Sequence, residues 1–196
     1  MNPTGHSLAD VIHTAETFLQ KYNPSGTLPI QIEEIVELQM NIAVIVVPGI
    51  KELLGIDAFI SSNFSQITID EYSYENYIER TRFSIAHELG HFLLHADWYK
   101  GHGPQNLDDY LTFHERINQE EYKYLEIQAN TFAGHVLVPT PAIHKTLRTK
   151  LGSIPSNEDL TVFLPFFQDM LEVFQVSGET LLIRLQNEKI VKASRR

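Results

Sequence analysis

Two histidines and a glutamate near the middle of the chain carry the clearest chemical signal in the sequence. They form the segment His87-Glu88-Leu89-Gly90-His91, an HExxH motif. On an α-helix, residues four positions apart share one face and lie about 6 Å apart along the axis, so both imidazoles could bind one metal ion. Glu88 projects about 100° around the helix from His87, where it could take a proton from a metal-bound water. The motif therefore predicts Zn2+ bound by His87 and His91, with Glu88 as the general base of a hydrolytic reaction.

The residues around the motif favour a metal site over a chance occurrence of HExxH on an exposed, polar helix. Residues 82–86 and 92–94 are mostly apolar, as expected for a helix that belongs to the core. Gly90 falls inside the expected helix, where glycine costs about 1 kcal/mol relative to alanine. We expect glycine at this position because a side chain would crowd a substrate beside the metal.

A catalytic zinc site needs a third protein ligand and one open position. His95 follows His91 by four residues, but on a straight helix it lies about 12 Å along the axis from His87, too far to complete the site. We therefore expect His95 to be a surface histidine, or at most to line the wall of the site or to contact a ligand residue from behind. Glu126 is the better candidate, because it begins a helical stripe on which an unpaired carboxylate would be costly. The stripe consists mainly of small and apolar residues: Glu126, Ala129, Asn130, Ala133 and Leu137.

Other polar side chains are candidates for supporting roles. Asn130, one turn after Glu126, could accept a hydrogen bond from the free ring N–H of a ligand histidine and so orient it. The negative charge that develops on the substrate oxygen needs a further donor. Four residues stay open as candidates for this donor: Tyr122, Tyr124, His114 and His135. Residues 98–112 contain two glycines and a proline and are interpreted as a loop, either a lid over the cleft or an ordinary exposed segment.

The rest of the sequence predicts the elements that must position these residues. Ser7 and Asp10 are typical of a capping box at the start of a helix that ends near Asn23. Further helices are expected at 29–40, 76–96, 119–138, 141–150, 160–174 with a break at Pro165, and 178–186 after Ser177. Residues 42–47 are mostly β-branched and predict a buried strand, and residues 58–61 and 66–70 predict a hairpin.

These elements predict an α+β fold. A small antiparallel or mixed sheet of about three strands is expected to pack on a helical domain that carries the HExxH helix. We expect a single zinc peptidase domain over residues 1–196, without a clear internal boundary. Its parts would be N-terminal helices and sheet at 1–75, metal-site helices at 76–140 and a helical C-terminal part at 141–196.

Composition narrows the classes of protein and partner. The chain has 196 residues, a formal net charge of −10 and no cysteine. The negative charge argues against direct binding of nucleic acid along a broad face. The sequence shows neither a signal peptide nor an apolar run long enough to cross a membrane, so we expect a cytoplasmic protein without a membrane partner.

Three separated blocks of sequence are similar to one known family. The block at 81–95 resembles the HExxH signature of the ImmA/IrrE metallopeptidases. Residues 126–133, which run into 137–139, resemble that family's second block, and 174–177 followed by Arg184-Leu185 resembles its usual ending. The resemblance implies a gluzincin-like site with His87, His91 and Glu126 as ligands and Glu88 as the base. The chain departs from related patterns at Asn130, where thermolysin-like enzymes often have Asp, and at Gly134-His135, where Ala-Glu is frequent.

The resemblance also implies a biological role, because family members commonly cleave or otherwise inactivate helix-turn-helix repressors. Three hypotheses follow for this chain. The first is a zinc-dependent endopeptidase that cleaves a regulatory protein or peptide, with such a repressor as the candidate substrate. The second is a zinc-containing module that binds and inactivates the repressor without cutting it. The third is a structural domain with a relic of the motif.

Overall fold

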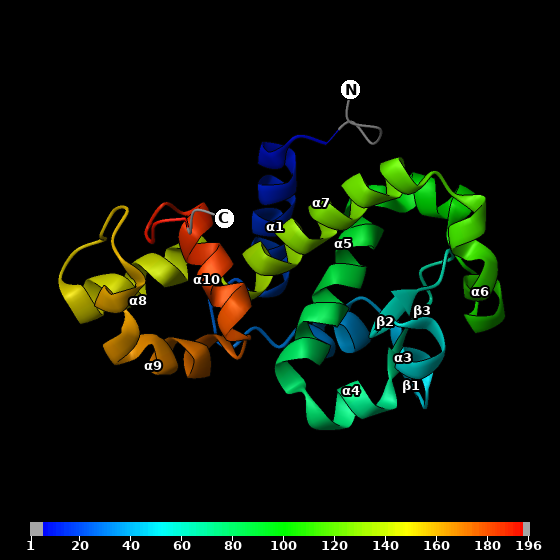
Figure 1. Ribbon diagram of the computed structural model, residues 1–196, viewed down its shortest axis with the longest axis horizontal. Coiled ribbons are helices and arrows are strands. Elements are labelled where there is room, and N and C mark those ends of the chain that lie inside the picture. Colours follow the sequence, from blue (N-terminus) through cyan, green and yellow to red (C-terminus); the bar gives the residue numbers. More distant parts are fainter. Residues whose placement is uncertain (1–5, 194–196) are drawn as a thin grey trace.

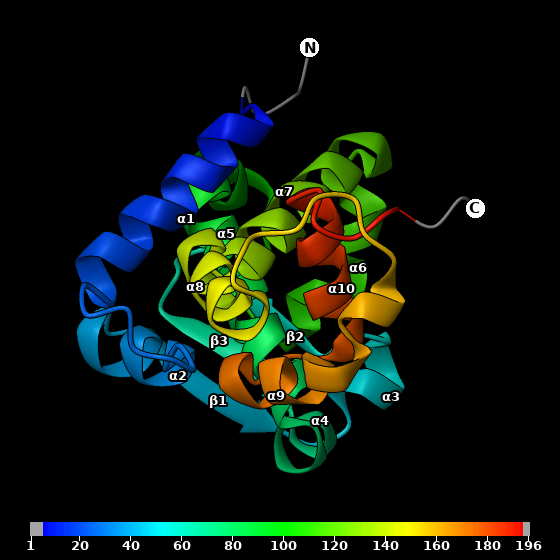
Figure 2. The same cartoon turned by 90° about the vertical axis from the view of Figure 1, so that its left-hand side faces the viewer.

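Two long helices form the scaffold of the computed structural model, which describes residues 6–193. Helix α5 (Ile78–His102) packs closely against α7 (Gln119–Leu137), and α1 (Leu8–Tyr22) packs mainly against α7. Figure 1 shows the sheet at one end of this scaffold and the C-terminal helices at the other, and Figure 2 shows α1 along one side. The C-terminal helices are α8 (Thr140–Leu151), α9 (Leu164–Phe174) and α10 (Gly178–Asn187).

A three-stranded mixed sheet lies beside α5, so the predicted α+β fold is confirmed. The strands are β1 (Ala43–Val47), β2 (Ala58–Ile60) and β3 (Gln66–Asp70), in the order β1-β3-β2. Strands β2 and β3 pair antiparallel as the predicted hairpin, whereas β1 pairs parallel to β3. Strand β2 is therefore an edge strand, and it packs against the helix that carries the HExxH motif.

The predicted strand at 42–47 is confirmed, but its predicted burial is wrong. Within the described residues β1 pairs only with β3, and Ile45 and Val46 are 40% and 37% exposed. A short β-branched run can form an exposed edge as well as a central strand, because the pattern reports strand propensity rather than the number of neighbouring strands.

The capping residues of α1 and α10 act as their sequences predict. Ser7 and Asp10 form the complete capping box of α1, and Ser177 caps α10. The helix predicted to start at Pro29 instead begins at Ile32 with α2 (Ile32–Glu34) and continues as a π-helical turn, Ile35–Gln39. It starts later because Ile32 N donates to Ile30 O in a tight turn that precedes the helix.

The prediction of a loop at 98–112 is wrong. Helix α5 continues to His102, and α6 (Leu107–Arg116) follows after only four residues, with Asn106 as its N-cap. Gly101 lies in the last turn of α5, whereas Gly103 and Pro104 lie in the short connection between the two helices. At the other end of α5, Tyr77 separates this helix from the short α4 (Glu71–Asn76).

One cluster of buried apolar side chains connects the elements of the scaffold, from Val11 on α1 to Val191 after α10. A smaller cluster of Phe59, Tyr110 and Phe113 fixes α6 against β2. Helix α3 (Ile50–Leu54) lies between β1 and β2 in the chain. Among the helices of residues 6–193, none is both long enough and apolar enough to cross a membrane.

Candidate metal centre

His87, His91 and Glu126 converge on one point between α5 and α7. One ligand atom from each of the three residues lies within 4.8 Å of those of the other two. The Nε2 atoms of His87 and His91 are 3.0 Å apart. Nε2 of His87 lies 3.3 Å from Oε2 of Glu126, and Nε2 of His91 lies 3.1 Å from Oε1 of the same carboxylate. The three residues predicted as metal ligands are thus brought together by two different helices, with the atoms suited to binding one ion.

The surroundings of these atoms fit a cation. Nδ1 of His87 lies 3.0 Å from Oδ1 of Asn130, an acceptor, so Nδ1 carries the hydrogen and the Nε2 lone pair faces Glu126 when the ring is neutral. Oε1 of Glu126 is shielded from solvent and makes no hydrogen bond to the described residues, although His91 Nε2 lies nearby. A buried carboxylate oxygen without a donor is costly unless a cation pairs with it. Two imidazoles and one carboxylate are a donor set that suits Zn2+.

Without a metal, one proton takes the place of the cation. Burial alone would lower the pKa of His87, but the hydrogen bond and charge of Glu126 outweigh it and raise this pKa to about 9. Burial lowers the pKa of His91 to about 4, so this ring stays neutral. Burial also opposes ionisation of Glu126, but the two imidazoles that face it hold its pKa well below the usual range. The metal-free centre is therefore a protonated His87 beside an ionised Glu126.

Glu88 lies next to the three ligand residues but has a different set of partners. Its Oε2 accepts a hydrogen bond from the backbone N–H of Ile60 on β2, at 2.9 Å. Burial raises the pKa of Glu88 to about 7, and the charge of Glu126 adds to this effect. A carboxyl group with a pKa near neutrality can both accept and return a proton at physiological pH.

Gly90 allows α7 to approach the HExxH helix. A Cβ atom at this position would lie 3.1 Å from the Cα of Ala129 and 3.2 Å from a ring carbon of Phe132. The predicted reason for this glycine, room for a substrate, is therefore wrong, because the space is filled by the backbone of α7. The close approach also sets the distance between Glu126 and the two imidazoles, because Glu126 lies on α7 one turn before Ala129.

Of the positions that the sequence leaves open for His95, the structure shows the one behind His91 and not the favoured one at the surface. His95 is 2% exposed, and its Nδ1 lies 3.1 Å from Nδ1 of His91. The preference for the surface is wrong because it assumes a straight helix, whereas the backbone of His95 is non-helical (φ −126°, ψ 19°) and α5 bends there. His95 is not among the converging ligand atoms, in agreement with its exclusion as a metal ligand.

A pocket of about 290 Å³ opens beside the ligand residues. His87, Glu88 and Glu126 line it on one side, and three tyrosines line it as well: Tyr99, Tyr110 and Tyr122. Burial raises the pKa of Tyr122, so its hydroxyl keeps its proton and remains a donor. Of these tyrosines the sequence indicates only Tyr122. Tyr99 and Tyr110 fall within the predicted loop at 98–112, and the amphipathic pattern at 107–116 is the signal in the sequence that could have identified Tyr110.

The other candidate donors lie elsewhere. Tyr124 is on the exposed side of α7, 48% exposed, and does not line the pocket. His114 is an exposed residue of α6 whose Nε2 contacts the hydroxyl of Tyr110 at 3.2 Å, so it touches the pocket only through a lining residue. His135 contacts Nη1 of the buried Arg184 and borders a different pocket, on the α1 and α8 side. The structure therefore brings Tyr122 to the site, but not Tyr124 or His135.

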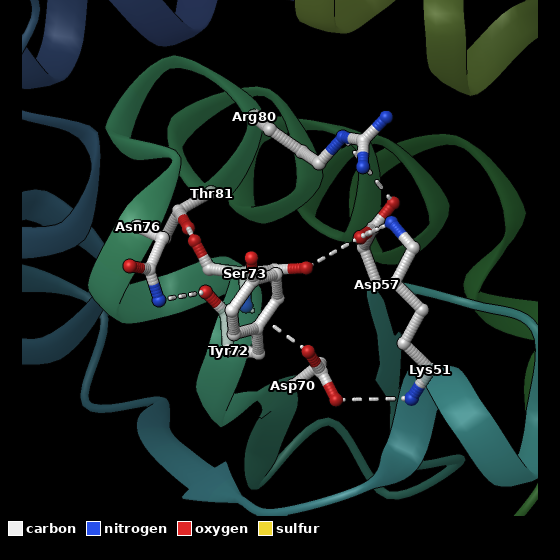
Figure 3. A network of polar contacts seen from close by, with 8 residues as sticks. All are labelled: Lys51, Asp57, Asp70, Tyr72, Ser73, Asn76, Arg80 and Thr81. Carbon is white, nitrogen blue, oxygen red and sulfur yellow. Dashed lines mark hydrogen bonds and ion pairs between the residues drawn. The ribbon is translucent and has the colours of Figure 1, made fainter.

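Asp57, which also lines this pocket, anchors the start of β2. Figure 3 shows its contacts with Lys51, Ser73 and Arg80. Its Oδ1 accepts hydrogen bonds from Lys51 Nζ at 2.6 Å and from Ser73 Oγ at 2.7 Å. Arg80 on α5 lies further away, with Nε 3.7 Å from Oδ2 of Asp57. A second pocket of about 600 Å³ shares Asp57, Phe83 and Ser84 with the first, so the two pockets adjoin along α5.

Comparison with known proteins agrees with this geometry. The solved structures to which the chain is similar include a Mycobacterium tuberculosis transcriptional regulator, with a TM-score of 0.56 and 17% sequence identity, which shows a shared fold. The alignment covers 91% of this chain but only 46% of that regulator. No curated protein matches the chain significantly. The model of the IrrE N-terminal-like domain, a peptidase family, matches residues 72–186, which include all three ligand residues and Glu88. Because this match extends over more than half of the sequence, the chain belongs to the family of the IrrE N-terminal-like domain.

Proposed function

We propose that this chain is a zinc-dependent endopeptidase. The observation that carries the proposal is the convergence of His87, His91 and Glu126 on one point beside Glu88, at a pocket that opens to solvent. A relic motif would have no reason to keep a third ligand on a separate helix. It would also have no reason to keep a buried carboxyl group whose pKa is raised to about 7 next to that ligand set.

Zinc bound by these three residues would polarise the scissile carbonyl and acidify a water molecule. The chain's own part in the chemistry belongs mainly to Glu88. Its carboxylate accepts a proton from the attacking water and returns that proton to the amine that leaves. The hydrogen bond from Ile60 N to Oε2 holds the carboxylate in place during both transfers.

Strand β2 is the element best placed to hold a peptide substrate. Asp57 and Ser61 direct their backbone hydrogen bonds to β3, because Asp57 O accepts from Asp70 N and Ser61 N donates to Gln66 O. Backbone groups alternate in an antiparallel pair, so those of Ala58 and Ile60 face the opposite edge, which borders the pocket. An extended substrate could add to this edge as a further strand through the N–H and carbonyl of Ala58 and the carbonyl of Ile60, because the Ile60 N–H already donates to Glu88.

Donors for the negative charge on the substrate oxygen come from the tyrosines. The hydroxyls of Tyr99 and Tyr110 both interact with that of Tyr122, and all three side chains line the pocket. A protonated hydroxyl in a largely buried site stabilises a developing oxyanion more effectively than one in water. Tyr122 is the central member of the three and is the donor we assign to this step.

The proposed substrate is a regulatory protein, with a helix-turn-helix repressor as the candidate. The family resemblance of the sequence supports this choice, and the structural neighbour described as a transcriptional regulator is consistent with it. The formal charge of −10 makes a protein substrate a more suitable partner than nucleic acid.

The first experiment is metal analysis of the purified chain. We expect about one zinc ion per chain in the wild type and a clear loss in Glu126→Ala. Glu120→Ala is the matched control, because Glu120 is an exposed residue at the start of the same helix. Absence of zinc from the wild type after incubation with the metal would refute the proposed centre.

A second experiment separates cleavage from binding. Repressors encoded near the gene are incubated with wild type and with Glu88→Gln, and the products are examined by mass spectrometry. We expect Glu88→Gln to bind both zinc and repressor but to leave the repressor intact. If the variant still inactivates the repressor, the chain acts by binding, and the peptidase proposal is wrong.

A further inference from the structure

A row of three buried side chains lies behind the ligand residue His91, on the side away from the pocket. Nδ1 of His91 contacts Nδ1 of His95 at 3.1 Å, and Nε2 of His95 contacts Oε1 of Gln128 at 2.8 Å. The three residues are 1%, 2% and 7% exposed, so water does not compete for these hydrogen bonds. The row joins α5 to α7 independently of Glu126.

The positions of the hydrogens in this row follow from its far end. Nε2 of Gln128 donates to the backbone carbonyl of His6 at 3.0 Å, and a carbonyl can only accept. The amide is thereby oriented with Oε1 towards His95, which must carry its hydrogen on Nε2. Nδ1 of His95 is then an acceptor, so His91 must carry its hydrogen on Nδ1 and its lone pair on Nε2.

The bend in α5 makes this row possible. On a regular helix two histidines four residues apart stand one above the other, but the non-helical backbone of His95 turns its ring towards both His91 and α7. The bend is held from outside by His6, whose Nε2 contacts the carbonyl oxygen of Leu94 at 2.7 Å. Residues before α1 therefore support the same segment that orients His91.

We propose that His95 and Gln128 are positioning residues that hold His91 in the tautomer whose Nε2 lone pair points at the metal. The proposal rests on the proposed zinc centre. The two histidine ligands would then be oriented in different ways. The exposed Asn130 orients His87, whereas the buried row orients His91. If the row is lost, the Nδ1–H of His91 has no acceptor, and the ring can then turn or change tautomer.

The wild-type chain tests the hydrogen assignment without any substitution. Long-range 1H–15N NMR spectra of the full chain, with and without zinc, report which ring nitrogen carries hydrogen. We expect His91 to be protonated on Nδ1 and His95 on Nε2 in both samples, and His91 to bind zinc through Nε2. Zinc on Nδ1 of His91, or hydrogen on Nδ1 of His95, would overturn the proposal.

Substitutions test the consequence for binding. His95→Phe keeps a ring of similar shape but removes the acceptor, and we expect about 10- to 100-fold weaker zinc binding in chelator competition. In His95→Asn the side-chain oxygen can replace Nδ1, so most of the affinity should return. His13→Phe is the control, because His13 is exposed on α1. Thermal unfolding identifies any variant that has lost its fold.

The two proposals fail in different ways. A folded His95→Phe variant that binds zinc as tightly as wild type would overturn the positioning role and leave the peptidase proposal intact. A wild-type chain that takes up no zinc would overturn the peptidase proposal. In that case the tautomers of His91 and His95 in the metal-free chain still decide whether the row is hydrogen-bonded as proposed.

Discussion

A Cβ atom on Gly90 would lie 3.1 Å from the Cα of Ala129, which makes this the point where α5 and α7 come into backbone contact. The metal centre depends on this contact. Two ligand residues are on α5 and the third is on α7, so the separation of the helices sets the distance between Glu126 and the two imidazoles.

We expect Gly90→Ala to weaken zinc binding and to lower stability. Alanine gains about 1 kcal/mol of helix propensity, but overpacking against a backbone that cannot move freely costs about 1–3 kcal/mol. Isothermal titration with zinc and thermal unfolding of the metal-free chain measure the two effects. Gly101→Ala is the control on the same helix, because nothing lies within 4 Å of its added Cβ, and it should be slightly stabilising. Equal zinc affinities in the two variants would contradict the proposed role of the helix contact.

The candidate ligand residues could be selected from the sequence because helical periodicity determines which residues share a face within each helix. His87 and His91 lie one turn apart, and Glu126 and Asn130 repeat the same spacing on a second helix whose small residues indicate close packing. These relations are local to each helix. The fold class could be predicted for a similar reason, because the hairpin and the long helices each have a clear local sequence pattern.

The partners of the site residues could not be predicted, because they depend on how the elements are placed. No proline or other breaker marks the bend at His95, so the sequence does not favour a contact between His95 and His91 over a surface position. Tyr110 reaches the pocket because α6 packs against β2, and Tyr99 reaches it because α5 continues beyond His95. The exposure of β1 likewise depends on strand order, which a β-branched run does not encode.

Asn130 provides a second prediction, because its side-chain oxygen faces Nδ1 of His87 at 3.0 Å. We expect Asn130→Ala to weaken zinc binding by about tenfold or more, since the ligand ring loses the partner that orients it. Asn130→Asp keeps an acceptor and adds charge, so its zinc affinity should equal or exceed that of wild type. Thr131→Ala is the control, because that hydroxyl donates within its own helix to Ile127 O. Chelator competition at fixed pH measures all four proteins, and an unchanged affinity in Asn130→Ala would exclude the orienting role.

Zinc binding should release one proton near neutral pH. His87 is protonated in the metal-free chain because its pKa is raised to about 9, and the metal must replace the proton on Nε2. His91 is already neutral and Glu126 already ionised, so neither contributes. Affinity should therefore rise about tenfold per pH unit between about pH 6 and 8.

Calorimetry in buffers of different ionisation enthalpy counts the released protons directly. The measurement is best made on Glu88→Gln, because Glu88 has a pKa of about 7 and would otherwise titrate in the same range. Release of no proton by the variant would mean that His87 is neutral before zinc binds. Release of two would mean that a second group, either another ligand residue or the acidified water, also loses a proton.

Arg184 provides the last prediction, and it concerns stability rather than chemistry. This residue of α10 is 2% exposed and donates to Val138 O, Thr140 Oγ1 and Glu188 Oε1, at 3.2, 3.1 and 2.8 Å. Removal of one partner of a buried ion pair typically costs about 3–5 kcal/mol, and the partial exposure of Glu188 places the expected cost of Arg184→Met near the lower end. Urea unfolding measures this loss, and the double variant Arg184→Met/Glu188→Met should recover part of it, since no carboxylate is then left unpaired. Zinc content should stay at the wild-type value in both variants, because the cluster fixes α10 to the end of α7 and includes none of the ligand residues. Loss of zinc from a variant that is still folded would show that the cluster reaches the metal centre, which the present geometry does not predict.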